Sequence, residues 1–131
     1  MIDSKERSGG ETKDALEGDT IRLPCRYNPS VRRSSKELVF YWQKTTTTKG
    51  QDLAAINSNT LVEDYVLESS PLEGKYDLII SSANYDRDDG FFECKIKETG
   101  SGIEIQSTSY SVTILSKLNR MIQTFISLSL S

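Results

Sequence analysis

The sequence contains no histidine, only two cysteines and a single tryptophan among its 131 residues. Zinc sites built from closely paired Cys and His ligands are therefore excluded. The sequence also lacks a phosphate-binding glycine loop on a strand-to-helix turn and any Gly-x-Ser-x-Gly segment. We expect a protein that is not an enzyme and that needs neither a cofactor nor a metal.

No hydrophobic run is long enough to cross a membrane. The most apolar segment, residues 121–131, is diluted by serines and falls short of the roughly 20 residues that a spanning helix needs. The first residues, MIDSKER, lack the apolar region of a secretory signal. We expect no direct membrane contact by this chain, with any signal peptide or membrane anchor outside it; a fragment, an incomplete gene product and a chain with reduced cysteines remain alternatives.

A strong excess of one charge is also missing. Sixteen basic and nineteen acidic side chains give a net charge of −3, which does not favour nucleic acid or anionic lipid as a partner. Residues 22–49 are locally basic and residues 51–74 carry acids but no Lys or Arg. A solvated, polarised surface explains this asymmetry, and a patch that steers a charged partner is the alternative.

What the sequence does contain is a series of strand patterns. GDTIRLPCRY alternates apolar and polar residues, ELVFYWQK is apolar on both faces, and KYDLIIS and FFECKIKE are further strands. TGSG after residue 98 is typical of a hairpin turn. Eight or nine short strands, with no helical period before residue 116, predict an all-β antiparallel sandwich.

The two cysteines allow one intramolecular disulfide. Closing so long a loop stabilises a fold by roughly 3–4 kcal/mol in the chain-entropy model, and a disulfide implies an oxidising, extracellular location. In the predicted strands Cys25, Trp42 and Cys94 share the inward side, and Asp88-x-Gly90-x-Phe92 leads into the second cysteine.

This arrangement resembles the variable-type immunoglobulin domain over residues 10–115. The resemblance implies a Cys25–Cys94 disulfide with Trp42 packed on it, and an immunoglobulin-like sandwich flanked by disordered segments at residues 1–9 and 116–131. The resemblance also implies that Leu78, Ile80 and Phe92 lie in the core and that Asp88 and Gly90 form the corner before the second cysteine.

Two departures from the family pattern concern the corner. Phe92 stands where the family usually has a tyrosine, so the packing is kept and the hydroxyl bond is lost. The corner aspartate commonly pairs with an arginine at the start of the fourth strand, but residues 51–74 contain none. We therefore expect Asp88 to use Lys75, backbone amides or water. Weak calcium binding by Asp86, Asp88 and Asp89 is an alternative.

A closer resemblance is carried by EGDTIRLPCRY, FYWQK, EGKYDLIISSANYDRDDGFFECKIKETGSG and YSVTIL. Together these segments are similar to the first immunoglobulin domain of the echinoid group of adhesion molecules, echinoid and friend of echinoid, which are related more distantly to nephrin. The resemblance implies a cell-surface adhesion or recognition module with a protein partner, either itself or another immunoglobulin-family protein.

In such domains one sheet face commonly docks the partner. The outward residues that we expect there include the partner-binding candidates Val39, Tyr41, Gln43, Phe91 and Lys95, with Glu93 and Lys97 at the rim. The alternative is that neighbouring strands merely cover these side chains. A secreted single domain acting as a soluble decoy or small-ligand carrier, and a truncated gene product, are the other functional readings.

Overall fold

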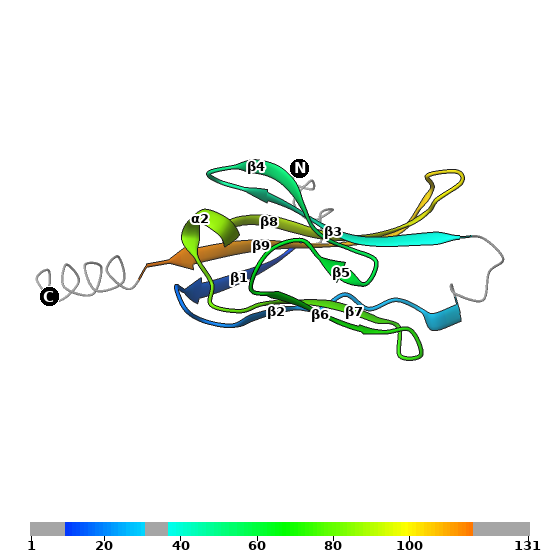
Figure 1. Ribbon diagram of the computed structural model, residues 1–131, viewed down its shortest axis with the longest axis horizontal. Helices are drawn as coiled ribbons and strands as arrows, with labels where there is room; N and C mark the ends of the chain where they lie inside the picture. The colour runs from blue at the N-terminus through cyan, green and yellow to red at the C-terminus, as the bar shows by residue number, and fades with distance from the viewer. Residues whose placement is uncertain (1–9, 31–36, 117–131) are drawn as a thin grey trace, which may run out of the picture.

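The computed structural model describes residues 10–30 and 37–116, which form nine strands in two facing sheets (Figure 1). The predicted all-β sandwich is confirmed. The expectation of disorder for residues 1–9 and 116–131 falls, apart from Ser116, outside the described residues.

The larger sheet has the strand order β1-β9-β8-β3-β4-β5, and the smaller sheet has the order β2-β7-β6. The larger sheet contains β1 (Glu11–Leu16), β3 (Leu38–Thr46), β4 (Gly50–Ile56), β5 (Asn59–Thr60), β8 (Gly90–Glu98) and β9 (Glu104–Leu115). The smaller sheet contains β2 (Ile21–Leu23), β6 (Tyr65–Ser70) and β7 (Lys75–Ile80). β1 runs parallel to β9, and the other pairings are antiparallel.

Alternation along each strand puts one set of side chains between the sheets. Ile21 and Leu23 are buried while Arg22 between them is exposed, as the pattern in GDTIRLPCRY predicts. Leu78, Ile80 and Phe92 are each 0% exposed. The hydrophobic core therefore lies between the two sheets, and the opposite face of each sheet is left for solvent or partners.

The disulfide joins Cys25, just after β2, to Cys94 on β8 and so connects the two sheets. Trp42 lies directly opposite Cys94 in the β3–β8 pairing and is 0% exposed. Its Nε1 donates a hydrogen bond of 3.0 Å to the carbonyl oxygen of Tyr76 on β7. The indole therefore fills the space beside the disulfide and also ties β3 to the opposite sheet.

The corner before β8 is a short helical turn, α2 (Tyr85–Asp88), and here the expected backbone-amide partner of Asp88 is present but the expected Lys75 is not. The buried Asp88 does not use Lys75. Its carboxylate accepts from Nε and Nη2 of Arg87 at 2.7 and 2.6 Å, from the Tyr65 hydroxyl at 2.5 Å and from the backbone N–H of Asn84 at 2.8 Å. The missing arginine is thus supplied by the adjacent residue, because α2 lets the side chain of Arg87 fold back over the corner.

Gly90 follows this corner and starts β8. A Cβ built at this position would lie 2.2 Å from the carbonyl oxygen of Thr45 and 2.7 Å from the Cα of Thr46. The backbone of β8 therefore approaches β3 more closely than any residue with a side chain allows. The glycine is required by this close approach as well as by its φ of 155°.

Candidate protein-binding face

The outer face of the larger sheet carries the side chains that the sequence placed there. Val39, Tyr41 and Gln43 on β3 alternate with the buried Phe40 and Trp42, and all three are half-buried. On β8 the same alternation leaves Phe91, Glu93, Lys95 and Lys97 half-buried. These residues are available to a partner, but neighbouring side chains cover part of each.

The pairing registers show which of these residues are neighbours. Tyr41 lies opposite Ile56 on β4 and opposite Lys95 on β8, and Lys95 in turn lies opposite Ser107 on β9. Residues that are directly opposite in a sheet share a face and have Cβ atoms about 4.5–5.5 Å apart. Ile56, Tyr41, Lys95 and Ser107 therefore form one continuous cross-strand row, which we call the Tyr41 row.

Apolar side chains continue on both sides of the Tyr41 row. Leu53 lies opposite Gln43 in the next row, and Val39 lies two residues before Tyr41 on the same side of β3. All of these apolar side chains are half-buried. The result is an apolar patch of Val39, Tyr41, Leu53 and Ile56 with polar neighbours, which is the composition of a protein-binding centre with a rim.

The sequence prediction did not include Leu53 and Ile56. Strict alternation along DLAAI would put Leu53 and Ile56 on opposite faces, so only one of them could be outward. The register between β3 and β4 shifts after Trp42, because Trp42 lies opposite Ala55 while Gln43 lies opposite Leu53. This bulge leaves Ala54 as an extra buried residue and turns both Leu53 and Ile56 to the outer face.

Phe91 lies away from this patch. It is opposite Thr45 on β3 and Ser111 on β9. Four residues along β8 separate Phe91 from Lys95 in the Tyr41 row, which is a distance of about 13 Å at the usual rise of a strand. The two aromatic residues chosen from sequence are therefore on the same face but do not form one contact.

Charged side chains at the rim are already partly engaged. Nζ of Lys95 lies 3.6 Å from a carboxylate oxygen of Glu104, and Nζ of Lys97 lies 5.8 Å from the ring centroid of Tyr41. The cation over the ring holds Lys97 beside the aromatic residue. This part of the face therefore offers both signs of charge around an apolar centre.

The outer face of the smaller sheet has a different character. Asp77 points outward from β7 but is 0% exposed, because Arg22 and Arg26 cover it with hydrogen bonds of 3.0 and 2.9 Å to Oδ2. Oδ1 also accepts from the backbone N–H of Cys25 at 2.9 Å. Burial alone would raise the pKa of Asp77, but the bonds from Arg26, the Cys25 amide and Arg22 hold it below its usual value.

Glu68 extends this ion network on the same face. Hydrogen bonds from Arg22 and Lys75 lower the pKa of Glu68 to about 2. Matched ion pairs therefore connect β2, β6 and β7 on this face, beside an apolar pair in which Val66 on β6 lies opposite Ile79 on β7. Arg22 is part of this network and is therefore not a neutral control position for mutagenesis.

The lysine at position 44 points inward from β3 instead of outward. Its Nζ donates to the backbone oxygen of Arg87 at 2.9 Å and to the hydroxyl of Tyr65 at 3.2 Å. Burial lowers the pKa of Lys44 below its usual value, although the nearby Asp88 opposes this effect. Lys44 thus belongs to the hydrogen-bonded corner around Asp88, and it is not part of the outer face.

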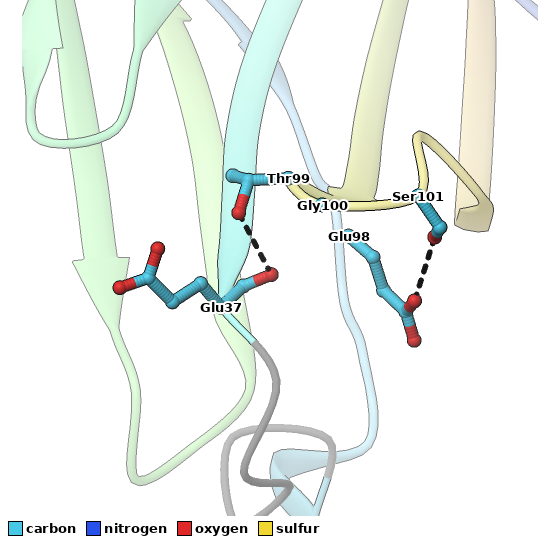
Figure 2. A pocket seen from close by; sticks show the side chains of 5 residues that line it. All are labelled: Glu37, Glu98, Thr99, Gly100 and Ser101. Carbon is cyan, nitrogen blue, oxygen red and sulfur yellow. Dashed lines mark hydrogen bonds between the residues drawn. The ribbon is translucent and has the colours of Figure 1, made fainter.

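A pocket of about 330 Å³ lies beside the β8–β9 hairpin and is lined by Glu37 and residues 98–101 (Figure 2). The Thr99 hydroxyl bonds to the backbone oxygen of Glu37, and the Ser101 hydroxyl donates to the Glu98 carboxylate at 2.7 Å. In Figure 2 the carboxylates of Glu37 and Glu98 point away from each other. These contacts shape the turn and do not gather a set of ligands.

Two of the three aspartates considered for calcium bond to other groups of the protein. Asp88 is bonded by Arg87 and Tyr65, while Asp89 accepts from the Ile114 N–H at 2.9 Å and from the Thr47 hydroxyl at 2.7 Å. Over residues 10–30 and 37–116, no group of three or more His, Cys, Asp or Glu side chains is arranged to hold a metal ion. No helix in this part of the chain has the length and hydropathy to span a membrane.

Comparisons with known proteins agree with this geometry. The immunoglobulin V-set domain model matches residues 10–115. The solved structure of the NK cell receptor Nkp44, described as a triggering partner in natural cytotoxicity, matches with a TM-score of 0.64 and 15% identity, covering 80% of this chain and 97% of that one. At that identity the structural match shows the fold alone.

No curated protein sequence matches the chain, so the closer resemblance to the echinoid group receives no support from these comparisons. The family itself rests on the match over residues 10–115, on the two-sheet sandwich and on the disulfide between its sheets. V-set domains are typical of extracellular, cell-surface recognition proteins. The chain belongs to the immunoglobulin V-set family.

Proposed function

We propose that this V-set domain is a cell-surface recognition module that binds a protein partner through the outer face of β4, β3, β8 and β9. The observation that carries the proposal is the Tyr41 row, in which Tyr41 is flanked by Ile56 and Lys95 on adjacent strands. Aromatic residues with apolar neighbours and a polar rim dominate the binding energy of protein interfaces.

The charge distribution supports the same face. The outer face of the smaller sheet carries ion pairs around Asp77 beside the Val66–Ile79 pair, whereas the Tyr41 row joins Ile56 and Tyr41 to Lys95, which pairs with Glu104. Desolvating the Tyr41 row costs less than desolvating a network of paired charges. The partner is therefore expected to place apolar side chains over Tyr41 and Ile56.

The kind of partner follows from the sequence resemblance. The segments similar to the echinoid group favour an immunoglobulin-family protein, including a second copy of this chain, as the partner. This finer assignment rests on those segments alone. Val39, Gln43, Phe91 and Lys95 are proposed as contributors around the centre, with Phe91 at its periphery.

The test is a bead-clustering assay with the domain displayed in its full-length context, together with staining of cells by a tetramer of the domain. Tyr41→Ala is compared with Tyr85→Ala, because Tyr85 is a tyrosine of α2 that is 39% exposed and lies off the proposed face. Ile56→Ala is compared in the same way with Val66→Ala on β6, which is 48% exposed.

We expect Tyr41→Ala and Ile56→Ala to weaken clustering or staining at least tenfold and the two control variants to leave it unchanged. Circular dichroism and thermal unfolding establish that all four variants are folded. Equal binding by all four folded variants would move the interface to another face and contradict the proposal.

A further inference from the structure

A second concave site lies between the two sheets, at the end of the sandwich where β3 begins. It has a volume of about 410 Å³, and its lining includes Tyr27, Leu38, Phe40, Ser58, Ser69 and Tyr76. None of its lining residues belongs to the Tyr41 row or to the apolar patch around it. Whatever this pocket binds is therefore a separate property from the protein-binding face.

Three aromatic rings form one wall of the pocket. The centroids of Tyr27 and Phe40 are 5.1 Å apart, and those of Phe40 and Tyr76 are 5.4 Å apart, with tilts of 55° and 53°. These side chains are 7%, 5% and 2% exposed, so only small parts of them face the opening. A further ring therefore meets the exposed edges of this wall, in the edge-to-face arrangement that aromatic pairs favour.

The wall is held in place by hydrogen bonds that do not depend on a ligand. The Tyr76 hydroxyl lies 3.1 Å from the carbonyl oxygen of Phe40 and 2.7 Å from that of Asn57. Asn57 also bonds to β3 in both directions, through its N–H to the Phe40 oxygen and through its Oδ1 to the Phe40 N–H. A preformed pocket of this kind loses little conformational freedom when a ligand enters.

The rim supplies polar groups without charge. Ser58 and Ser69 line the pocket, and their hydroxyls form no hydrogen bond to any other residue in the described part of the chain. No Asp, Glu, Lys or Arg is among the lining residues that the structure describes. An uncharged lining gives no compensation for the desolvation of a charged ligand, so the site favours a neutral one.

We propose that this pocket is a binding site for a neutral small molecule that consists of an aromatic ring with a hydrogen-bonding substituent. The ring packs against Tyr27, Phe40 and Tyr76, and the substituent reaches the hydroxyl of Ser58 or Ser69. The volume lies within the range of about 300–1,000 Å³ that is usual for small-molecule sites. Aromatic walls with a few hydroxyl groups are the usual chemistry of such sites.

The probe for this proposal is p-cresol, and the readout is the two-dimensional ¹H–¹⁵N spectrum of the whole chain. Trp42 is the single tryptophan, so its indole N–H gives one resolved signal. That N–H donates to the carbonyl oxygen of Tyr76, whose ring lines the pocket. We expect saturable shifts of the Trp42 indole signal and of the Ser58 and Ser69 amides.

Two related probes separate the contributions of the ring and the substituent. Toluene keeps the ring and lacks the hydroxyl, and we expect it to bind about 2–10-fold more weakly than p-cresol, as the loss of one neutral hydrogen bond implies. The anion p-toluate keeps the ring and adds a charge, and we expect it to bind more weakly than toluene. Tighter binding of p-toluate than of p-cresol would overturn the proposal.

A filling substitution with a neighbouring control tests the location. Ser69 lines the pocket opposite Tyr76 on β7, whereas Ser70, opposite Lys75, points to the other face of β6. Ser69→Phe should therefore abolish p-cresol binding, and Ser70→Phe should leave it unchanged. Should Ser69→Phe fail to fold, the smaller Ser69→Leu replaces it, with Ser70→Leu as its control.

Three further results would show that the proposal is wrong. They are the absence of saturable shifts with p-cresol up to its solubility, unchanged binding by a folded Ser69 filling variant, and equal loss in the Ser70 control. Loss of bead clustering or cell staining in the Tyr41 variant has no bearing on this site, because the pocket and the Tyr41 row share no residue.

Discussion

The hydroxyl of Tyr65, at the start of β6, donates a 2.5 Å hydrogen bond to the fully buried carboxylate of Asp88 in α2. Many variable-type domains have an arginine near the start of this strand that pairs with the corner aspartate. Such an arginine both connects the corner to the strand and supplies the positive charge. Here Tyr65 makes the connection from β6, and Arg87, the residue before Asp88, supplies the guanidinium. The corner is therefore bonded to the smaller sheet through Tyr65, and no arginine of that sheet takes part.

This division predicts the effect of Tyr65→Phe. The substitution removes the hydroxyl and leaves the ring, so Asp88 stays buried with one donor fewer. We expect a loss of about 1.5–3 kcal/mol in the free energy of unfolding, the usual size of a hydrogen bond to a charged group, because Arg87 and the Asn84 N–H still bond to the carboxylate. Urea unfolding measures this loss, and Tyr85→Phe serves as a control because Tyr85 is an exposed tyrosine of the same corner. Equal stability of the two variants would show that the hydroxyl of Tyr65 contributes nothing.

The sequence was sufficient for the fold because its strongest signals are local. Alternation placed Cys25, Trp42 and Cys94 on one side of their strands, and the resemblance then paired the cysteines, as the structure does. A backbone amide bonds to Asp88, as one of the expected alternatives had it. The bond from the adjacent Arg87 was missed because it depends on the turn of α2, which has no periodic pattern in the sequence.

The residues on the outer face of the larger sheet were predicted only in part for a related reason. Side-chain parity along β3 and β8 follows from alternation, so Val39, Tyr41 and Lys95 were placed on the correct face. The bulge that turns both Leu53 and Ile56 outward depends on how β4 pairs with β3, which is a long-range relationship. Alternation puts Phe91 and Tyr41 on the same face, but only the pairing register shows that they lie in different cross-strand rows.

A second prediction concerns Gly90. Replacement by alanine would bring a Cβ to 2.2 Å from the Thr45 carbonyl oxygen, so the β3 and β8 backbones would have to separate. We expect Gly90→Ala to lose about 3 kcal/mol or more of stability, a size typical of clashes with a fixed backbone. Gly100→Ala in the hairpin turn is the matched control, because a Cβ there meets no atom within 4 Å. Thermal unfolding of both variants tests the difference.

The ion network around Asp77 predicts a dependence of stability on pH. Its pKa is lower in the folded protein than in the unfolded chain, where it is about 3.9. The ionised form is therefore favoured by folding, and this contribution is present above pH 4 and is lost as the pH falls through the folded pKa. Glu68, with its pKa lowered to about 2, acts in the same direction.

Unfolding by urea between pH 7 and pH 2 measures this contribution. Wild-type stability should fall below pH 4, and the fall should be smaller in Asp77→Asn, which keeps an oxygen for the Cys25 N–H but loses the charge. Arg26→Gln should reduce the fall as well, since it removes one of the cations that lower the pKa of Asp77. Parallel pH profiles for wild type and Asp77→Asn would exclude Asp77 as the origin.

The core prediction concerns Trp42. It is 0% exposed, lies opposite Cys94 and bonds to Tyr76 on the other sheet. Trp42→Ala leaves a large cavity beside the disulfide and should cost about 3–5 kcal/mol, enough to prevent folding of a marginally stable domain. Trp42→Phe refills part of the cavity and should recover part of the loss. Secretion level and thermal unfolding report both effects, and a Trp42→Ala variant as stable as wild type would contradict this packing argument.

The last prediction separates the centre of the proposed protein-binding face from its periphery. Tyr41 and Ile56 lie directly opposite each other, so a partner side chain that touches one also touches the other. A double-mutant cycle of Tyr41→Ala and Ile56→Ala should therefore show a coupling of about 0.5 kcal/mol or more in binding free energy.

Phe91 is about 13 Å along the sheet from the Tyr41 row, and at that distance substitutions act independently. The cycle of Tyr41→Ala with Phe91→Ala should thus be additive within about 0.5 kcal/mol. Surface plasmon resonance against the partner, or bead clustering at graded surface density for self-association, supplies the free energies. Strong coupling between Tyr41 and Phe91, together with none between Tyr41 and Ile56, would mean that the partner spans the sheet along β8 and that the centre is not the Tyr41 row.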